Sequence, residues 1–114
     1  MTTETLNHTE TIRDLNDTFR TNPHLHGHLM ITHGVQALGN ENVQKICRLV
    51  SEFDEFSKDN DPYHEHDFGS LDFEKTKIFW KIDYYAADLM HGSENPADPS
   101  ITTRVMTIML AEEY

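Results

Sequence analysis

The chain has 114 residues, of which 20 are acidic, 9 are Lys or Arg and 8 are His, so its formal net charge is −11. This length and a hydrophobic content of 37% predict one globular domain over residues 1–114. The single cysteine excludes an internal disulfide framework and a four-thiolate zinc site. The scattered cations form no basic patch, which argues against direct binding to nucleic acid or to an anionic membrane surface. No apolar run approaches the ~18 residues of a membrane span and the N-terminus is unlike a signal peptide, so we expect a cytoplasmic protein.

The first half of the chain predicts two amphipathic helices separated by a short strand. Ile12, Leu15 and Phe19 lie at helical spacing and place the first helix over about residues 4–20. Pro23 ends this helix because the residue before a proline avoids the helical region. Residues 29–32 then predict a strand, and Asn40 is the expected N-cap of the second helix. The apolar stripe of that helix comprises Val43, Ile46, Cys47, Val50, Phe53 and Phe56 or Ser57.

A β-hairpin is predicted after a polar loop over residues 58–66. Its strands are Asp67–Glu74 and Lys77–Tyr85, with residues 75–76 as the turn. In the second strand alternate residues are apolar, which sends Trp80 toward the core and pairs it with Leu71. The register is supported because a slip of one residue would put one apolar set in water.

The last element is predicted to be a helix that begins at Asp98 as N-cap, with Pro99 in its first turn. Its expected apolar stripe comprises Ile101, Val105, Ile108 and Met109. The fold class is therefore α+β in the order α-β-α-β-β-α, a three-stranded antiparallel sheet with three flanking helices.

Several short strings in the second half of the chain carry a family resemblance. They are Phe53-Asp54-Glu55-Phe56, Asp59-Asn60-Asp61-Pro62-Tyr63, Glu65-His66-Asp67-Phe68-Gly69, Phe79-Trp80-Lys81-Ile82-Asp83-Tyr84-Tyr85, Pro96-Ala97-Asp98-Pro99 and Leu110-Ala111-Glu112-Glu113-Tyr114. Through them residues 53–114 resemble an uncharacterised bacterial family, the domain of unknown function number 3768. The resemblance implies a small stand-alone protein, often from plasmid or phage neighbourhoods, and supplies no catalytic residues. His33 and His64 depart from the family, which often has proline at the first position and commonly glycine at the second.

One group of residues could form a reactive centre on the outer face of the predicted hairpin. The expected register places His66 opposite Tyr85 and brings Asp83 within diagonal distance. A carboxylate that orients an imidazole is the usual arrangement for acid–base catalysis. Asp61, His66 and Asp83 could alternatively hold a divalent metal ion in a small hydrolase or metal-binding protein. The competing interpretation is that these groups only cap the chain and fasten the loop to the sheet.

The same outer face predicts a docking surface, which is our preferred functional hypothesis. Phe68, Phe79 and Tyr85 point away from the core, so a helix or a partner must cover them. The remaining residues of the expected partner-binding surface are Asp61, Tyr63 and Glu65. An acidic, non-enzymatic module of this kind would bind a basic protein partner, for example as an inhibitor or anti-defence factor from a mobile element. Two alternatives stay open: the charge only maintains solubility, or the aromatic residues pair in a homodimer.

No cofactor is expected for this preferred function, because the glycine-rich nucleotide-binding motifs are absent. Cys47 lies on the apolar stripe of the second helix, where a thiol is expected to be a core residue rather than a nucleophile.

Overall fold

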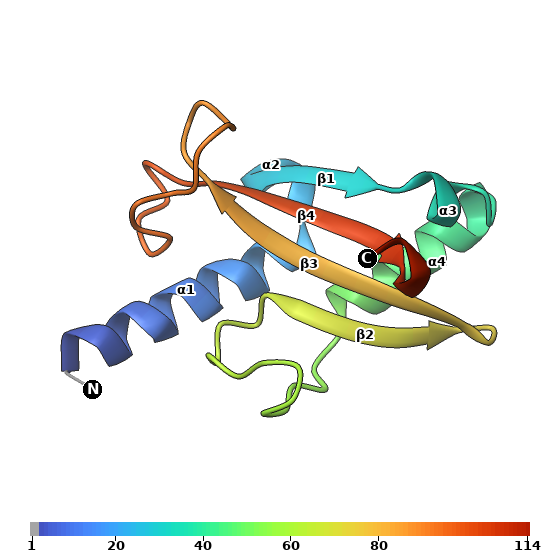
Figure 1. Ribbon diagram of the computed structural model, residues 1–114, viewed down its shortest axis with the longest axis horizontal. Helices are drawn as coiled ribbons and strands as arrows, with labels where there is room; N and C mark the ends of the chain where they lie inside the picture. The colour runs from blue at the N-terminus through green and yellow to red at the C-terminus, as the bar shows by residue number, and fades with distance from the viewer. Residues whose placement is uncertain (1–2) are drawn as a thin grey trace.

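A mixed sheet of four strands forms the centre of the molecule (Figure 1). The computed structural model describes residues 3–114, with side chains from residue 8 onward. The strands β1 (Gly27–Ile31), β2 (Phe68–Phe73), β3 (Thr76–Tyr85) and β4 (Thr103–Leu110) lie in the order β1-β4-β3-β2. β1 is parallel to β4, whereas β3 is antiparallel to both β4 and β2. The predicted α+β class is confirmed, but the predicted three-stranded antiparallel sheet is wrong.

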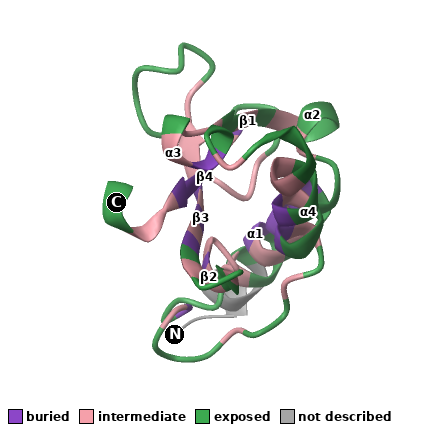
Figure 2. Cartoon of the chain, turned by 90° about the vertical axis from the view of Figure 1, so that its right-hand side faces the viewer, coloured by how far each residue is buried: buried purple, intermediate pink, exposed green. Residues whose placement is uncertain are grey.

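The two long helices, α1 (Thr3–Thr21) and α4 (Asn40–Ser51), lie on the same side of the sheet (Figures 1 and 2). The short helices α2 (Pro23–His26) and α3 (His33–Gln36) flank the two ends of β1, and a 3-10 turn, η1 (Ala111–Glu113), follows β4. In the described part of the chain, no helix combines the length and apolar character needed to cross a membrane. One sheet face is covered by helices, while no helix formed by residues 3–114 lies across the other face (Figure 2).

The hydrophobic core fills the space between the sheet and the two long helices. Trp80 is fully buried on the covered face of β3, as the alternation in its strand predicted. Phe53 and Phe56 pack edge-on against its indole, with ring centroids 5.5 and 6.2 Å away. The buried core comprises Phe19, Val35, Ile46, Val50, Ile78, Trp80, Ile82, Met106 and Ile108.

The hairpin turn lies one residue earlier than expected. Glu74 and Lys75 form it, both with positive φ (48° and 73°), as a two-residue type I′ turn requires. Trp80 therefore lies opposite Gly69, and Leu71 lies opposite Ile78 instead of Trp80. A Cβ atom at Gly69 would collide with the Trp80 indole, so this pairing requires the glycine. Packing of the indole selects the register at the expense of two strained turn residues.

The predicted C-terminal helix is instead the central strand β4 (Thr103–Leu110). Its outward residues Val105 and Met109 and its inward residue Ile108 are all apolar, so a buried central strand mimics a helical stripe. Asp98 does not cap a helix, because its carboxylate accepts from the backbone N–H and hydroxyl of Ser100 (2.9 and 2.6 Å). The β-branched residues of the segment fit a strand better than a helix.

The second helix was predicted to continue to about Phe56, but α4 ends at Ser51. Gly39 is its N-cap, and Asn40 is its first residue. Ile46 and Val50 are buried as expected, and Cys47 packs partly buried against the core, where burial raises the pKa of its thiol.

The resemblance implies glycine at position 64 and proline at position 33, and the backbone at both positions suits those residues. His64 has φ 61°, in the left-handed region that glycine adopts without strain. His33 is the first residue of α3, a position that suits proline because its N–H has no partner within the helix.

Candidate functional site

The sheet face opposite Trp80, here called the uncovered face, carries apolar and aromatic side chains together with polar and charged ones. The strand pairing places Phe68, Phe79 and Tyr85 on it, as predicted. Its other residues are His28, Met30, Ser70, Asp72, Lys77, Lys81, Asp83, Thr103, Val105, Thr107 and Met109. Met109 is 4% exposed although no helix covers it, which indicates close packing among its neighbours on this face.

Three aromatic rings form a cluster at one end of the uncovered face. The ring centroids of Phe68 and Phe79 are 5.2 Å apart. Tyr114 packs edge-on against them at 6.0 and 5.7 Å and is itself 76% exposed. The rings hold one another in place, so this part of the face is an ordered aromatic surface.

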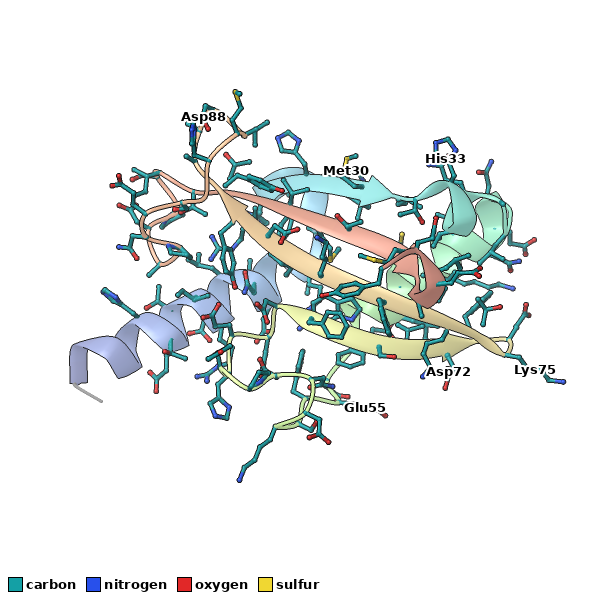
Figure 3. The ribbon with its side chains drawn as sticks, in the orientation of Figure 1. Met30, His33, Glu55, Asp72, Lys75 and Asp88 are labelled. Carbon is teal, nitrogen blue, oxygen red and sulfur yellow. The ribbon has the colours of Figure 1, made fainter. Side chains whose placement is uncertain are left out.

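A hollow with a volume of about 690 Å³ lies at the other end of the uncovered face. Met30, Tyr85, Leu89 and Val105 supply its apolar lining, and His28 is among its polar residues. Leu89 has φ 60° in the loop after β3, a conformation that costs energy for a leucine. Asp88 holds the loop by accepting from the backbone N–H groups of the two residues after Leu89 (2.9 and 3.1 Å). The loop therefore presents an exposed leucine beside the hollow in a fixed conformation (Asp88 is labelled in Figure 3).

Asp83 lies in the middle of the uncovered face, where it pairs with Lys81. The Lys81 Nζ atom is 3.0 Å from an Asp83 carboxylate oxygen. The hydrogen bond to Asp83 raises the pKa of Lys81, so the ammonium stays charged at neutral pH. This pair makes the centre of the face locally neutral rather than acidic.

His66 belongs to the loop before β2 and lies on the opposite side of the sheet from Asp83, against α1. Its Nδ1 atom is 2.8 Å from Asp17 Oδ1, and its Nε2 atom is 3.6 Å from Asp61 Oδ2. The ring stacks on Phe56 with centroids 3.7 Å apart. Because β2 begins only at Phe68, His66 is outside the hairpin and does not face Tyr85 as predicted.

The predicted reactive centre of His66, Asp83 and Tyr85 is therefore not assembled. The expected metal ligands are separated in the same way, since Asp61 lies beside His66 while Asp83 is on the other face. Within the residues that the structure describes, no group of three or more His, Cys, Asp or Glu side chains is arranged to hold a metal ion. The contacts of His66 fasten the loop before β2 to α1. This arrangement agrees with the competing interpretation, in which His66 and Asp61 have a structural role.

A second polar cluster under α1 is centred on Tyr84. The Tyr84 hydroxyl donates to Glu65 Oε1 and accepts from Asn16 Nδ2, both at 2.8 Å. Asn16 is fully buried, and its Oδ1 atom accepts from Arg104 Nε at 2.7 Å. Arg104 also donates to the carbonyl of Pro96 (2.7 Å). Burial raises the pKa of Tyr84, so the phenol is a neutral donor in a satisfied network rather than an acid–base group.

Asp67 lies near this cluster, and its charged form is unfavourable. Burial raises its pKa to about 6, and the nearby negative charges of Glu65, Asp61 and Asp83 add to the effect. Its backbone carbonyl accepts from the Ile82 N–H at 2.8 Å, which holds Asp67 at the start of the hairpin. The charged form of Asp67 therefore destabilises the fold at neutral pH.

Arg20 joins α1 to the C-terminal end of α4. It is 5% exposed and donates to the carbonyls of Val50 (3.1 Å) and Phe53 (2.7 Å) and to Asp17 (2.7 Å). A cation is favoured at a helix C-terminus, where the last carbonyls have no partner within the helix. Arg20 explains why α4 ends at Ser51 rather than continuing toward Phe56.

Two predicted partner-binding residues are internal. Asp61 is 3% exposed and accepts from the His66 N–H at 3.0 Å, and Glu65 accepts from Tyr84. Tyr63, by contrast, is 75% exposed in the loop before β2. Of the six residues of the predicted docking surface, the sheet itself carries Phe68, Phe79 and Tyr85.

The sequence argument missed the buried polar residues Asn16, Arg20 and Arg104. A signal for two of them was present, because Asn16 and Arg20 lie four and eight residues after Ile12 on the same helix face. Arg104 gave no such signal while its segment was assigned to a helix.

The family model described as a protein of unknown function (DUF3768) matches residues 31–113. This chain belongs to the DUF3768 family. No curated protein and no solved structure matches it.

The DUF3768 match begins at the last residue of β1 and so leaves out α1 and α2. His66, Tyr84 and Arg104 lie inside the matched region, whereas their partners Asn16 and Asp17 lie outside it. The N-terminal helix of this DUF3768 chain thus completes two polar clusters whose other members belong to the family region.

Proposed function

We propose that this chain is a small non-enzymatic module that binds a basic protein partner through the uncovered face. The observation that carries the proposal is a sheet face across which the described part of the chain places no helix (Figure 2). The strand pairing puts Phe68, Phe79, Tyr85 and Val105 on this face. Aromatic side chains are enriched at the centre of protein interfaces, because they bury a large area at a small entropic cost.

The charge of the molecule supports a basic partner. The sequence has a net charge of −11. Arg20 and Arg104 are buried, while Asp61 is the one acid that is buried among the described residues. The surface is therefore more acidic than the composition alone implies. Acidic surfaces attract basic proteins over several ångströms and accelerate their association.

The enzyme alternative lacks its geometry. Catalysis by His66 would require it to lie beside Asp83 and Tyr85, but His66 contacts Asp17 and Asp61 on the covered side. We therefore favour binding over acid–base or metal-assisted hydrolysis.

A more specific role completes the proposal: the module acts in the cytoplasm as an inhibitor or anti-defence factor that covers a basic site on its partner. The high negative charge and the mobile-element setting that the family resemblance implies both support this role.

The test is affinity capture with the purified chain as bait, followed by binding measurements on the recovered, identified protein. The variant Tyr85→Ser/Val105→Ser removes apolar contacts from the uncovered face, and Leu25→Ser is the matched control because Leu25 is 74% exposed on α2. We expect a basic protein that binds wild type and the control equally, binds the double variant at least tenfold more weakly, and dissociates at high salt.

Two outcomes contradict the proposal. A partner that is acidic, or whose binding is insensitive to salt, would show that the acidic surface does not attract the partner. Equal binding by wild type and the double variant would place the interface outside the uncovered face. Light scattering on the purified chain tests the homodimer alternative. A dimer that the double variant abolishes would mean that the uncovered faces of two copies bind each other.

A further inference from the structure

The outer edge of β2 has unpaired backbone groups. β2 pairs only with β3, and the Ile82 N–H donates to the Asp67 carbonyl at 2.8 Å. In an antiparallel pair, hydrogen-bonded and non-hydrogen-bonded residues alternate, so Phe68, Ser70 and Asp72 direct their N–H and C=O groups away from β3. Within the described residues none of these backbone groups has a hydrogen-bond partner.

This edge has few of the features that usually protect a sheet margin, with Asp72 as its one charged residue. β2 is six residues long, its sequence FGSLDF contains no Pro or Lys, and it pairs with β3 without a bulge. Natural edge strands are normally blunted by such features because a free edge accepts a further strand. At the other margin, the outward carbonyl of Ile31 in β1 is already occupied by the Gln36 side chain (2.7 Å).

A groove of about 380 Å³ runs beside this edge, between β2 and the C-terminal end of α4. Leu49, Phe53 and Leu71 form its apolar part, and Phe53 is fixed by its contact with Trp80. Four acids line the same groove (Glu55 and Asp72 are labelled in Figure 3). They are Glu52, Asp54, Glu55 and Asp72.

These acids are exposed, and almost none of their charge is neutralised. Asp72 has a distant contact with Lys77 (3.7 Å), in which both side chains are more than half exposed. Glu52, Asp54 and Glu55 have no ion pair within the described residues. Such carboxylates repel an acidic ligand and attract Lys or Arg side chains placed along the groove.

We propose that the outer edge of β2 binds an extended basic segment of a protein partner, which adds to the sheet as a fifth strand. Main-chain hydrogen bonds to Phe68, Ser70 and Asp72 would hold the segment, as in other cases of strand addition. Its groove-side residues would be Lys or Arg, whose apolar stems would cover Leu71 and Phe53 while their charged ends reach the acids. A second copy of this chain is disfavoured, because edge-to-edge pairing would bring two acidic grooves together.

The inference rests on the proposed function only in that both require a basic partner. The uncovered face would bind through its side chains, whereas the edge would bind through the main chain of β2 and the groove beside it. The test uses a synthetic peptide of about ten residues in which Lys or Arg alternates with Val or Leu. Its binding is measured by calorimetry and by the NMR shifts of the chain's backbone amides. Two further peptides serve as ligand controls, one with every cation replaced by Glu and one N-methylated at alternate residues so that it cannot pair.

We expect the basic peptide to shift the amides of Phe68, Ser70 and Asp72 and the two control peptides to bind at least tenfold more weakly. The variant Glu52→Gln/Asp54→Asn/Glu55→Gln should weaken binding of the basic peptide about tenfold, because three exposed charge contacts are lost. The matched control removes three exposed acids outside the groove. Its substitutions are Glu41→Gln, Glu94→Gln and Glu112→Gln.

Equal weakening by the two triple variants would overturn the proposal, because it would mean attraction by net charge alone. Equal binding of the N-methylated peptide would exclude strand addition. Retained binding by Tyr85→Ser/Val105→Ser separates the edge from the uncovered face. Because the peptide assay needs no cellular partner, failure to recover one would count against the proposed function without affecting this result.

Discussion

Neighbouring residues of β3 show how differently the two sides of one sheet are used. Trp80 is fully buried between the sheet and the helices, whereas Phe79, the preceding residue, is half-buried on the uncovered face. Their side chains have similar chemistry, and only the helix layer distinguishes them. An apolar residue in a strand thus predicts that something covers it, but it does not predict whether the cover is a helix of the same chain or a partner.

The polar residues reverse this contrast. The covered side contains the hydrogen-bonded clusters of Asn16, Arg20 and Tyr84. The uncovered face has the pair of Lys81 and Asp83 and the longer contact between Lys77 and Asp72. Buried polar groups are rarely left without partners, so a dense cluster often joins elements rather than performing chemistry. In this molecule the polar clusters stabilise the fold, and the apolar face is the candidate for function.

The largest expected effect tests whether the two faces differ in stability. Trp80→Ala should lower the free energy of unfolding by about 3–5 kcal/mol, because it empties the core beside Gly69. Phe79→Ala should cost only about 1 kcal/mol, since its ring stays partly in water. Urea denaturation of both variants measures the difference. Equal losses would mean that the uncovered face is a second core.

Removal of the buried guanidinium of Arg20 should have the next largest effect. Arg20→Met keeps most of the side-chain volume but removes one donor from each of two carbonyls and from Asp17, so we expect a loss of about 2–3 kcal/mol. Arg48→Met, on the exposed surface of α4, should change stability by less than about 0.5 kcal/mol. If thermal unfolding showed the same small change for both, Arg20 would not join α1 to α4 as described.

Asp67 gives a smaller effect that depends on pH. Its pKa of about 6 in the fold exceeds the ordinary value of 3.8, so between these values the folded chain binds more protons than the unfolded chain. The free energy of unfolding therefore falls as pH rises through this window. Asp67→Asn should stabilise the fold by about 1 kcal/mol at pH above 6, a value that allows for solvent screening of the partly exposed carboxyl. This gain in stability should disappear below about pH 4. Denaturation midpoints of wild type and Asp67→Asn between pH 4 and 7 measure it, and a gain that persisted at low pH would refute the raised pKa of Asp67.

The smallest effect on stability is expected where the effect on binding is greatest. Tyr85→Ser/Val105→Ser changes the apolar lining of the hollow on the uncovered face and should cost no more than about 1 kcal/mol, because both side chains are partly exposed. The same variant should lose at least tenfold in affinity for the basic partner. Calorimetric unfolding alongside the binding assay checks both values. A variant that unfolded readily would assign these residues to the core instead.

Local patterns in the sequence determined much of the fold. Alternation in β3 sent Trp80 inward and Phe79 outward, and helical spacing located α1 and most of α4. These inferences held because each depends on which face of one element meets water, a property that the element's own residues encode. The position of Phe68, Phe79 and Tyr85 on the outer face followed for the same reason.

Only the tertiary structure decided which elements lie beside one another. The segment from Thr103 to Leu110 became a strand because β1 and β3 occupy its two edges, a condition that its own apolar residues cannot report. The hairpin register was set by contact of the Trp80 indole with Gly69, against the preferences of the turn. His66 and Asp83 were likewise separated by the path of the loop before β2, because hydrogen bonds to α1, distant in sequence, determine where that loop lies.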